Sequence, residues 1–368
     1  MKKLCLVSGI YPPDIGGPAT FIPNLAKRMQ LQNYQCTVLT LSDSKSSIRV
    51  EHGIRVIRIS RKISRIFRVP ILVFALLLIG TTNPQFIVNG LYEEFGIANL
   101  FLKRKAIIKI VGDPVWERFR NNNSKLISIE SFNSISLPLK YKIQRKIFVI
   151  SLNQANLIVT PGKSLIPIIK SWKVRPRILY IPNGVNISKI ISRERMNRAI
   201  VISRLVSWKN IDKAIESCIN ANLPLDIFGE GPEKERLERI SRDSKSEICF
   251  YPAVSHKTAL DLLSKYDYFI LLSEYEGQSF ALLEAMSLGC VVIVSDIPAN
   301  TDVVEDAVNG YVISTDSQEV INAKLRNAIS DPNKNIQIRE NSIKYISYSH
   351  NFENITKQFI ELLESDCH

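Results

Sequence analysis

The sequence contains few of the residues that bind metals or form disulfide bonds. Its 368 residues include 4 dispersed histidines and 6 cysteines without a CxxC pair. No group of residues has the spacing of metal ligands, so we expect no bound metal. Cysteines scattered through apolar runs are typical of buried free thiols in a reducing compartment.

The sequence also lacks a hydrophobic run long enough to span a bilayer. The longest run, residues 69–80, is shorter than the roughly 20 residues required, and it fits a buried helix or an element at a membrane surface. The basic start of the chain precedes only a short apolar run, interrupted by Pro12 and Pro13, so we expect no signal peptide. A complete GxGxxG fingerprint is absent, which disfavours a Rossmann dehydrogenase.

Charge is distributed unevenly along the chain. Residues 1–198 hold 32 Lys and Arg against 9 Asp and Glu, whereas residues 199–368 hold 16 against 26. Halves of opposite net charge favour two domains, and the basic half is expected to face an anionic partner. An aromatic-interleaved or helix-turn-helix signature is missing, so an anionic membrane surface is a better candidate than nucleic acid.

Short apolar runs alternate with helical patterns throughout the sequence. This alternation predicts an α/β fold with two Rossmann-like, doubly wound parallel sheets. The predicted domains are residues 1–178 and 179–349, with a C-terminal helix in 350–368 that packs back on the first domain.

The most informative stretch is residues 273–289, "SEYEGQSFALLEAMSLG". A buried strand is expected to end here in a loop that carries Glu274 and Glu276, and the following helix carries Glu284. Ligands of open α/β sheets bind at the carboxyl ends of strands, and helix N-termini favour phosphate. By this pattern alone, the acids are equally compatible with an ordinary surface position.

Three other loops follow predicted strands. Gly16 and Gly17 lie between the first strand and its helix, where paired glycines allow either close approach to a ligand or a plain turn. Arg204 and Lys209 lie in a later strand-to-helix loop. Asp113 also follows a strand, where it is a candidate site residue and a candidate N-cap of the next helix, two roles that are compatible.

A basic segment precedes the longest apolar run. Arg61, Lys62, Arg65 and Arg68 recur at helical spacing, beginning from Arg58. This pattern predicts either a basic amphipathic helix at a membrane or a solvated helix face.

Several of these stretches together resemble one family. The segment "YEGQSFALLEAMSLGCVVIVSDIPANTDVVEDAVNGYVI" resembles the donor-binding segment of glycosyltransferase family 4, retaining enzymes of GT-B fold. In the order of that family come "YPPDIGGPATFIPNLAKRM", "YIPNGVN", "ISRLVSWKNIDKAIES" and "DIFGEGPEKERLE". The pair Glu276 and Glu284 matches the family's two-glutamate motif.

The resemblance implies roles for individual residues. Arg204 and Lys209 would pair with the donor diphosphate, Glu276 would bind the donor sugar, and Glu284 the ribose. The backbone at Gly16 and Gly17 would approach the diphosphate. Other donor contacts would come from the loop Gly277, Gln278, Ser279, Phe280 and Ala281, and from the base-binding residues Gly229, Ala253 and Val254.

One position departs from the family pattern. Many members have a histidine near the reacting sugar in the first domain, and Asp113 occupies the matching strand end here. This position implies that Asp113 holds a sugar hydroxyl or the acceptor, or assists in taking the acceptor's proton.

The resemblance implies a metal-independent, cofactor-free, retaining transfer of a sugar from a nucleotide-diphosphate sugar to an acceptor hydroxyl. The expected setting is bacterial cell-surface polysaccharide synthesis, such as lipopolysaccharide, on a lipid-linked acceptor at the inner face of the cytoplasmic membrane. Nucleic acid is not an expected partner. The alternatives are a sugar-nucleotide epimerase, a phosphorylase, which would need a cofactor lysine, and a non-catalytic nucleotide-sugar-binding subunit.

Overall fold

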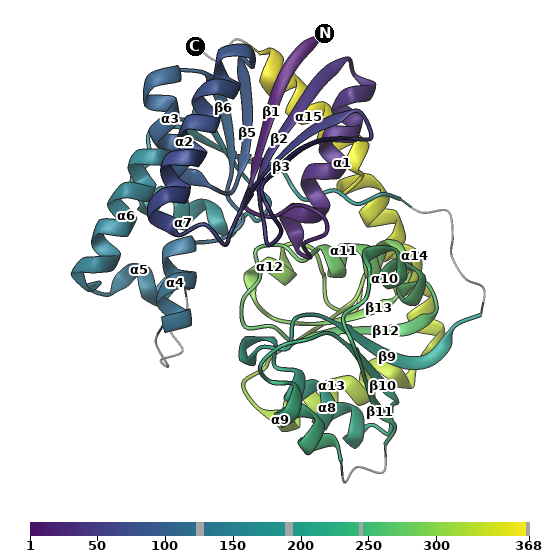
Figure 1. Ribbon diagram of the computed structural model, residues 1–368. Coiled ribbons are helices and arrows are strands. Elements are labelled where there is room, and N and C mark those ends of the chain that lie inside the picture. Colours follow the sequence, from purple (N-terminus) through teal and green to yellow (C-terminus); the bar gives the residue numbers. More distant parts are fainter. Residues whose placement is uncertain (123–128, 188–193, 243–245, 366–368) are drawn as a thin grey trace. The chain divides into compact units, whose positions relative to one another are not determined.

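The chain folds into two compact units, seen in a computed structural model that describes residues 1–122, 129–187, 194–242 and 246–365 (Figure 1). Unit 1 comprises Met1–Asn183 and Glu353–His368, and unit 2 comprises Gly184–Phe352. The sequence-based boundaries are 178/179 and 349/350. Residues 366–368 of the expected C-terminal helix lie outside the described residues.

Unit 1 is built on a sheet whose described strands run in the order β3-β4-β2-β1-β5-β6-β7-β8. Neighbouring strands are parallel except β3, which pairs antiparallel with β4. This antiparallel edge strand was not predicted. The strands are β1 (Lys2–Ser8), β2 (Tyr34–Ser42), β3 (Ser47–Glu51), β4 (Ile54–Ser60), β5 (Gln85–Asn89), β6 (Lys105–Lys109), β7 (Leu157–Thr160) and β8 (Arg177–Tyr180).

Helices connect the parallel strands of unit 1. They are α1 (Gly17–Leu31), α2 (Arg65–Thr82), α3 (Tyr92–Leu102), α4 (Pro114–Asn122), α5 (Ile129–Ser134), α6 (Leu139–Leu152), α7 (Leu165–Ser171) and the C-terminal α15 (Phe352–Glu364). Phe359 of α15 packs against Phe21 of α1, with ring centroids 5.7 Å apart. The backbone of α15 also accepts a hydrogen bond of 2.7 Å from Gln85 to the Leu363 carbonyl. These contacts hold the end of the chain in unit 1.

A lysine is enclosed in this packing. Lys109, at the end of β6, is 1% exposed, and its ammonium lies 4.1 Å from the centroid of the Phe21 ring. Burial lowers the pKa of Lys109 to about 7, because the charged form loses its hydration. The contact with an aromatic face partly offsets this cost.

Unit 2 has a wholly parallel sheet with the strand order β11-β10-β9-β12-β13-β14. Numbered along unit 2, this is the 3-2-1-4-5-6 order of a doubly wound nucleotide-binding fold. The strands are β9 (Met196–Ile202), β10 (Leu225–Phe228), β11 (Ile248–Tyr251), β12 (Tyr266–Leu271), β13 (Val291–Ser295) and β14 (Tyr311–Ile313).

The connections of unit 2 are helical. They are the 3-10 turn η1 (Ser207–Lys209), α8 (Ile211–Asn220), α9 (Lys234–Ser241), α10 (His256–Leu263), α11 (Phe280–Ser287), α12 (Pro298–Thr301), α13 (Gln318–Ser330) and α14 (Pro332–Ser349). The C-terminal helix α15 is predicted from the sequence, whereas α14 is not, because its composition is mostly polar. Ile338 and Ile346 are the large apolar residues that α14 buries.

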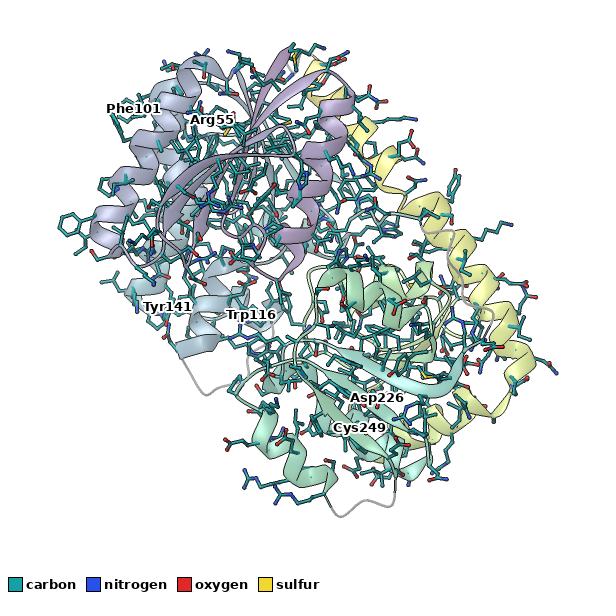
Figure 2. All side chains as sticks on the ribbon, turned by 45° about the vertical axis from the view of Figure 1, so that its right-hand side comes forward. Arg55, Phe101, Trp116, Tyr141, Asp226 and Cys249 are labelled. Carbon is teal, nitrogen blue, oxygen red and sulfur yellow. The ribbon has the colours of Figure 1, made fainter. Side chains whose placement is uncertain are left out.

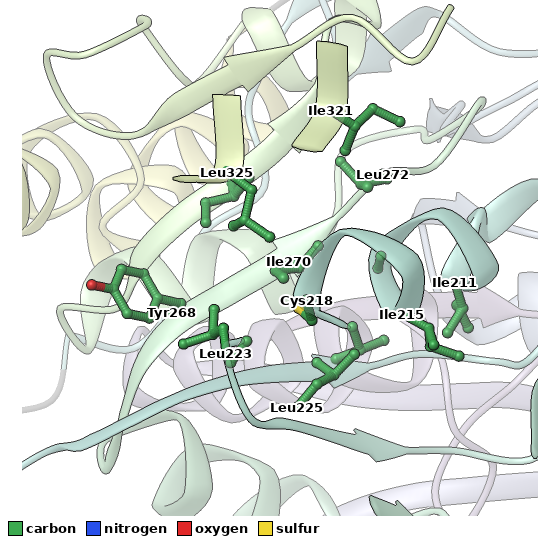
Figure 3. Close-up of a cluster of buried hydrophobic side chains, with 14 of the residues drawn as sticks. Ile211, Ile215, Cys218, Leu223, Leu225, Tyr268, Ile270, Leu272, Ile321 and Leu325 are labelled. Atoms are coloured by element: carbon green, nitrogen blue, oxygen red, sulfur yellow. The ribbon is translucent and has the colours of Figure 1, made fainter. Parts of the chain in front are cut away.

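Both faces of the unit 2 sheet are covered by apolar side chains. On one face, Ile215 and Cys218 of α8 pack near Leu225 and Ile270 of the strands (Figure 3). On the other face, Phe269 and Val292 pack with the apolar side of α11. A sheet buried on both faces explains the continuous apolar runs of the sequence and leaves the strand ends as the place for polar function.

Candidate active site

Loops from several strands of unit 2 meet at the carboxyl edge of the sheet. Strands β9 and β12 are neighbours, although β10 and β11 lie between them in sequence. The chain therefore leaves the sheet in opposite directions after β9 and β12, which opens a crevice at the switch point. The loop after β9 carries Arg204 and Lys209, and the loop after β12 carries Glu276.

The structure joins these two loops by direct contacts. Lys209 forms an ion pair with Glu276, and the Ser273 hydroxyl donates a 2.7 Å hydrogen bond to the same carboxylate. The backbone N–H of Glu274 donates to the Trp208 carbonyl at 2.8 Å. The predicted phosphate-binding lysine and the predicted sugar-binding acid thus neutralise each other.

Arg204 differs from Lys209 in its surroundings. Its side chain is exposed, and it forms no ion pair within the part of the chain that the structure describes. The guanidinium is therefore a cation available to an anionic ligand. A planar group with several N–H donors suits a phosphate.

Glu284 lies on α11, and its carboxylate accepts a hydrogen bond of 2.7 Å from the ring of His256 at the start of α10. Glu284 is buried, whereas His256 is about half exposed. The bond to Glu284 raises the pKa of the His256 imidazole, against the lowering effect of its partial burial. The sequence analysis does not predict His256 as a site residue. Its position just after the end of β11 is a signal that could have identified it.

The start of α11 lies between the two acids. Ser279 caps the helix by accepting a 3.3 Å hydrogen bond from the Leu282 N–H. The free N–H groups of a first helical turn attract anions. The predicted loop of Gly277, Gln278, Ser279, Phe280 and Ala281 is thus a backbone surface next to Glu276.

The glycine of the β10 loop is required by packing. A Cβ atom on Gly229 would lie 1.9 Å from the Ser203 carbonyl oxygen, and the Gly229 N–H donates to the Tyr251 carbonyl at 3.1 Å. Gly229 therefore lets the β9 and β10 loops approach each other. Ala253 and Val254 follow β11 at the same edge of the sheet.

An aromatic pair beside this loop was not predicted. The Tyr251 and Phe228 rings stack with centroids 4.6 Å apart and planes at 12°. Tyr251 is 39% exposed, so part of an aromatic ring reaches solvent near the predicted base-binding loop.

In unit 1, Gly16 and Gly17 lie where α1 begins after β1. Gly16 has φ of +149°, a conformation that L side chains rarely adopt. The loop is held by Arg61, which donates to the Gly9 carbonyl at 2.9 Å and pairs with Asp14 at 2.6 Å. Arg61 thus supports the glycine loop.

The basic residues that recur at helical spacing from Arg58 to Arg68 do not share one helix. Arg58 belongs to β4 and pairs with Glu51, and α2 begins only at Arg65. Arg68 donates to the Arg61 carbonyl at 2.8 Å. Of the four basic residues assigned to a membrane or acceptor, Lys62 and Arg65 are exposed, whereas Arg61 and Arg68 are used inside the unit.

Asp113 has a structural role. Its carboxylate is fully buried, pairs with Arg145, and caps α4 by accepting from the Val115 and Trp116 N–H groups at 2.9 and 3.1 Å. The N-cap role that the sequence allows for Asp113 is therefore confirmed. Both carboxylate oxygens are engaged within unit 1, which gives Asp113 a structural role, and its assignment as a catalytic candidate stays a prediction.

Comparison with known sequences agrees with this arrangement. Residues 185–345 match the family model for glycosyl transferases group 1. The chain is 30% identical over 171 residues to the UDP-N-acetylglucosamine--peptide N-acetylglucosaminyltransferase GtfA subunit of Streptococcus agalactiae, which covers 44% of this chain but only 33% of that protein. An uncharacterized glycosyltransferase of Methanocaldococcus jannaschii is 24% identical, and the alignment covers 98% of both chains.

Solved structures share the fold. Sucrose-phosphate synthase from Thermosynechococcus elongatus superposes with a TM-score of 0.79 at 15% identity, covering 99% of this chain and 98% of that one. Anabaena HepE in complex with UDP and glucose gives 0.77 at 15% identity, covering 99% of both. These likenesses confirm the predicted GT-B class of fold. Within unit 2, residues 185–345 resemble the group 1 glycosyl transferases, and together with the glycosyltransferase relatives this match indicates a transferase enzyme.

Proposed function

We propose that the protein transfers a sugar from a nucleoside-diphosphate sugar to an acceptor hydroxyl with retention of configuration. The observation that carries the proposal is the gathering of Arg204, Lys209, Glu276 and Glu284 at one edge of the unit 2 sheet. The chain aligns with only about a third of the GtfA subunit. The proposed substrate class is therefore inferred from the residues of the candidate site. The UDP bound by Anabaena HepE supports a nucleotide donor.

Each side chain has a distinct task in this proposal. Arg204 and Lys209 neutralise the diphosphate, the group on which negative charge develops as the glycosidic bond breaks. Glu276 holds hydroxyls of the transferred sugar and Glu284 holds the ribose diol. Because Lys209 and Glu276 are paired without ligand, the donor exchanges one ion pair for two ligand contacts.

The reaction replaces one bond at the anomeric carbon by another on the same face. The bond from that carbon to the diphosphate oxygen breaks, and a bond to the acceptor oxygen forms. The departing diphosphate, held by the two cations, receives the acceptor proton. This route needs no covalent enzyme intermediate and no side-chain base, in keeping with the enclosed position of Asp113.

We further propose that the acceptor is lipid-linked and that the enzyme acts in cell-surface polysaccharide synthesis at the inner face of the cytoplasmic membrane. The basic first half of the chain supports an anionic surface as partner. The Poly(ribitol-phosphate) alpha-N-acetylglucosaminyltransferase of Staphylococcus aureus, 26% identical over 61% of this chain and 47% of that protein, supports a surface-glycan acceptor.

The first experiment identifies the donor and then tests Glu276. Thermal-shift screening against UDP-, GDP- and ADP-sugars selects the donor, and transfer is assayed with lipid-linked acceptors. Glu276→Gln should lower kcat by about 100-fold or more, because it weakens contacts to the reacting sugar. Calorimetry should show that nucleoside-diphosphate binding weakens only about tenfold or less, since Glu284 and the cations remain.

The matched control is Glu274→Gln, an exposed acid two residues away in the same loop. It should retain activity within about twofold. Equal loss in both variants would contradict the proposal. Release of nucleotide without any acceptor would favour an epimerase, and tight donor binding without turnover would favour a non-catalytic binding subunit.

A further inference from the structure

Large apolar side chains are exposed in stripes on three helices of unit 1. On α2 they recur at helical spacing, so they share one side of the helix. Phe67, Phe74 and Phe101 are the most exposed aromatic members, at 69%, 62% and 75%. The stripes consist of Phe67, Ile71, Phe74 and Leu78 on α2, Ile97, Leu100 and Phe101 on α3, and Leu139, Ile143, Ile147 and Ile150 on α6.

The three helices are packed side by side, α2 on α3 and α3 on α6 (Figure 1). Glycines allow the close approach. A Cβ on Gly80 of α2 would lie 2.4 Å from Leu102, and a Cβ on Gly96 of α3 would lie 2.4 Å from Ser151 of α6. The stripes therefore belong to one layer, and Phe101 points outward from it in Figure 2.

Other residues of the same helices are buried, so the exposed stripes do not simply reflect poor packing. Helix α2 buries Leu72 and Leu76, and α6 buries Phe148 and Leu152. Each helix thus has two apolar sides, one in the core and one in solvent. An exposed apolar surface of this extent marks an interaction site.

The charge around the stripes is positive. Neither α2 nor α6 contains an acidic residue. Lys140, Lys142 and Lys146 of α6 are exposed, as is Arg65 at the start of α2. Glu93 of α3 is neutralised by an ion pair of 2.9 Å with Arg118.

We infer that α2, α3 and α6 form a docking face that inserts its apolar side chains into the surface of an anionic lipid bilayer. The combination of aliphatic and aromatic stripes with flanking lysines matches the chemistry of such a surface. The inference rests on the proposed function, because a lipid-linked acceptor requires the enzyme to reach the leaflet.

Helix α2 is also the one described helix long and apolar enough to cross a membrane by length and composition, and 22% of that window is buried in the unit. Its packing on α3 through Gly80 and its buried Leu72 and Leu76 argue for lying on the bilayer rather than spanning it. Ala75 and Leu78 of α2 line, with Ile57, a groove of about 580 Å³ that adds apolar surface beside the face.

The test uses sedimentation of the full chain with vesicles. Vesicles of phosphatidylcholine with phosphatidylglycerol should bind the protein at least about tenfold more tightly than phosphatidylcholine alone, and salt should weaken the binding. A Phe67→Ser, Phe74→Ser, Phe101→Ser variant and a Lys140→Glu, Lys142→Glu, Lys146→Glu variant should each lose about tenfold or more in vesicle affinity.

Matched controls lie on unit 2. Tyr348→Ser with Ile336→Ser removes exposed apolar side chains of α14, and Lys257→Glu with Lys344→Glu reverses exposed charges. Both controls should bind vesicles like the wild type. All variants should bind nucleoside diphosphate normally, which separates a failure of docking from a failure of the proposed function.

Three results would overturn the inference. Vesicle binding that is insensitive to both sets of substitutions would show that this face does not contact the bilayer. Binding that resists both high salt and alkaline carbonate would indicate that α2 spans the bilayer. Self-association that the phenylalanine variant abolishes, without vesicle binding by the wild type, would assign the face to a second copy of the chain.

Discussion

His256 and Glu284 form the contact in the candidate site that responds most directly to pH. Their hydrogen bond raises the pKa of His256. A histidine whose pKa is raised by folding contributes stability below its ordinary pKa of about 6.5, and that contribution is lost as pH rises through the raised value. A ribose that binds Glu284 competes with the imidazolium for the carboxylate, so proton binding and donor binding oppose each other.

Donor affinity should therefore increase as pH rises above about 6.5 through the raised pKa of His256, by roughly threefold. His256→Gln should flatten this dependence in KM for the donor, with little change in kcat, when initial rates are measured from pH 6 to 8. The control His52→Asn, an exposed turn residue of unit 1, should keep the wild-type profile. An unchanged slope in His256→Gln would refute the linkage.

At the scale of elements, α1 and α15 both pack near the end of β6, around the buried amine of Lys109. Lys109 has its pKa lowered to about 7 by burial, from 10.5 when exposed. Between these pH values the unfolded chain binds more protons, so the free energy of unfolding increases with pH across the window. Below about pH 7 the cost of charging a buried amine is present in full.

Lys109→Met keeps the apolar length of the side chain and removes that cost. We expect it to increase the free energy of unfolding at pH 7 by about 2 kcal/mol, less than the full pKa shift implies because the contact with Phe21 is also lost. Urea unfolding at pH 7 and pH 10 should show a smaller difference for the variant than for the wild type.

Lys105→Met is the matched control on the same strand. Lys105 is partly exposed and donates to the Leu363 carbonyl at 2.9 Å, so its loss should not stabilise the protein. If Lys109→Met instead lowered the free energy of unfolding as much as the control does, the buried amine would have a stabilising hydrogen-bond partner in solution.

At the scale of the whole molecule, the net charge of residues 199–368 and the charge of the cations in the candidate site have opposite signs. The half of the chain that contains the candidate site carries an excess of acids, yet its proposed ligand is an anionic diphosphate. The local cations Arg204 and Lys209 decide the chemistry there, because interactions of exposed charges fall off within about 8–10 Å in physiological salt.

If these two cations neutralise the diphosphate, transfer should not depend on a divalent metal. Activity in EDTA should remain within about twofold of that in Mg²⁺ or Mn²⁺, whereas Arg204→Gln should lower kcat by roughly 100-fold. Lys234→Gln, which removes a partly exposed cation of the same unit that is paired with Glu230, serves as the charge control. A loss of activity in EDTA that a divalent cation restores would contradict the proposal.

The sequence by itself determined the α/β architecture of both units and identified Glu276 and Glu284 as candidate site residues. Alternating apolar runs and helical patterns are local properties, since each segment must bury one side or both. The spacing of Glu276 and Glu284 likewise depends only on one loop and the helix that follows it. Helix α14 and strand β3 are not predicted from the sequence, because they bury few residues and their pattern is mostly polar.

Only the tertiary structure decided which groups meet. The pairing of Lys209 with Glu276 follows from the adjacency of β9 and β12, which are separated in sequence by two other strands. The enclosure of Asp113 by Arg145 depends in the same way on packing between segments distant along the chain. Sequence patterns specify which side of an element is buried, whereas strand order and helix packing determine the partner of each polar group.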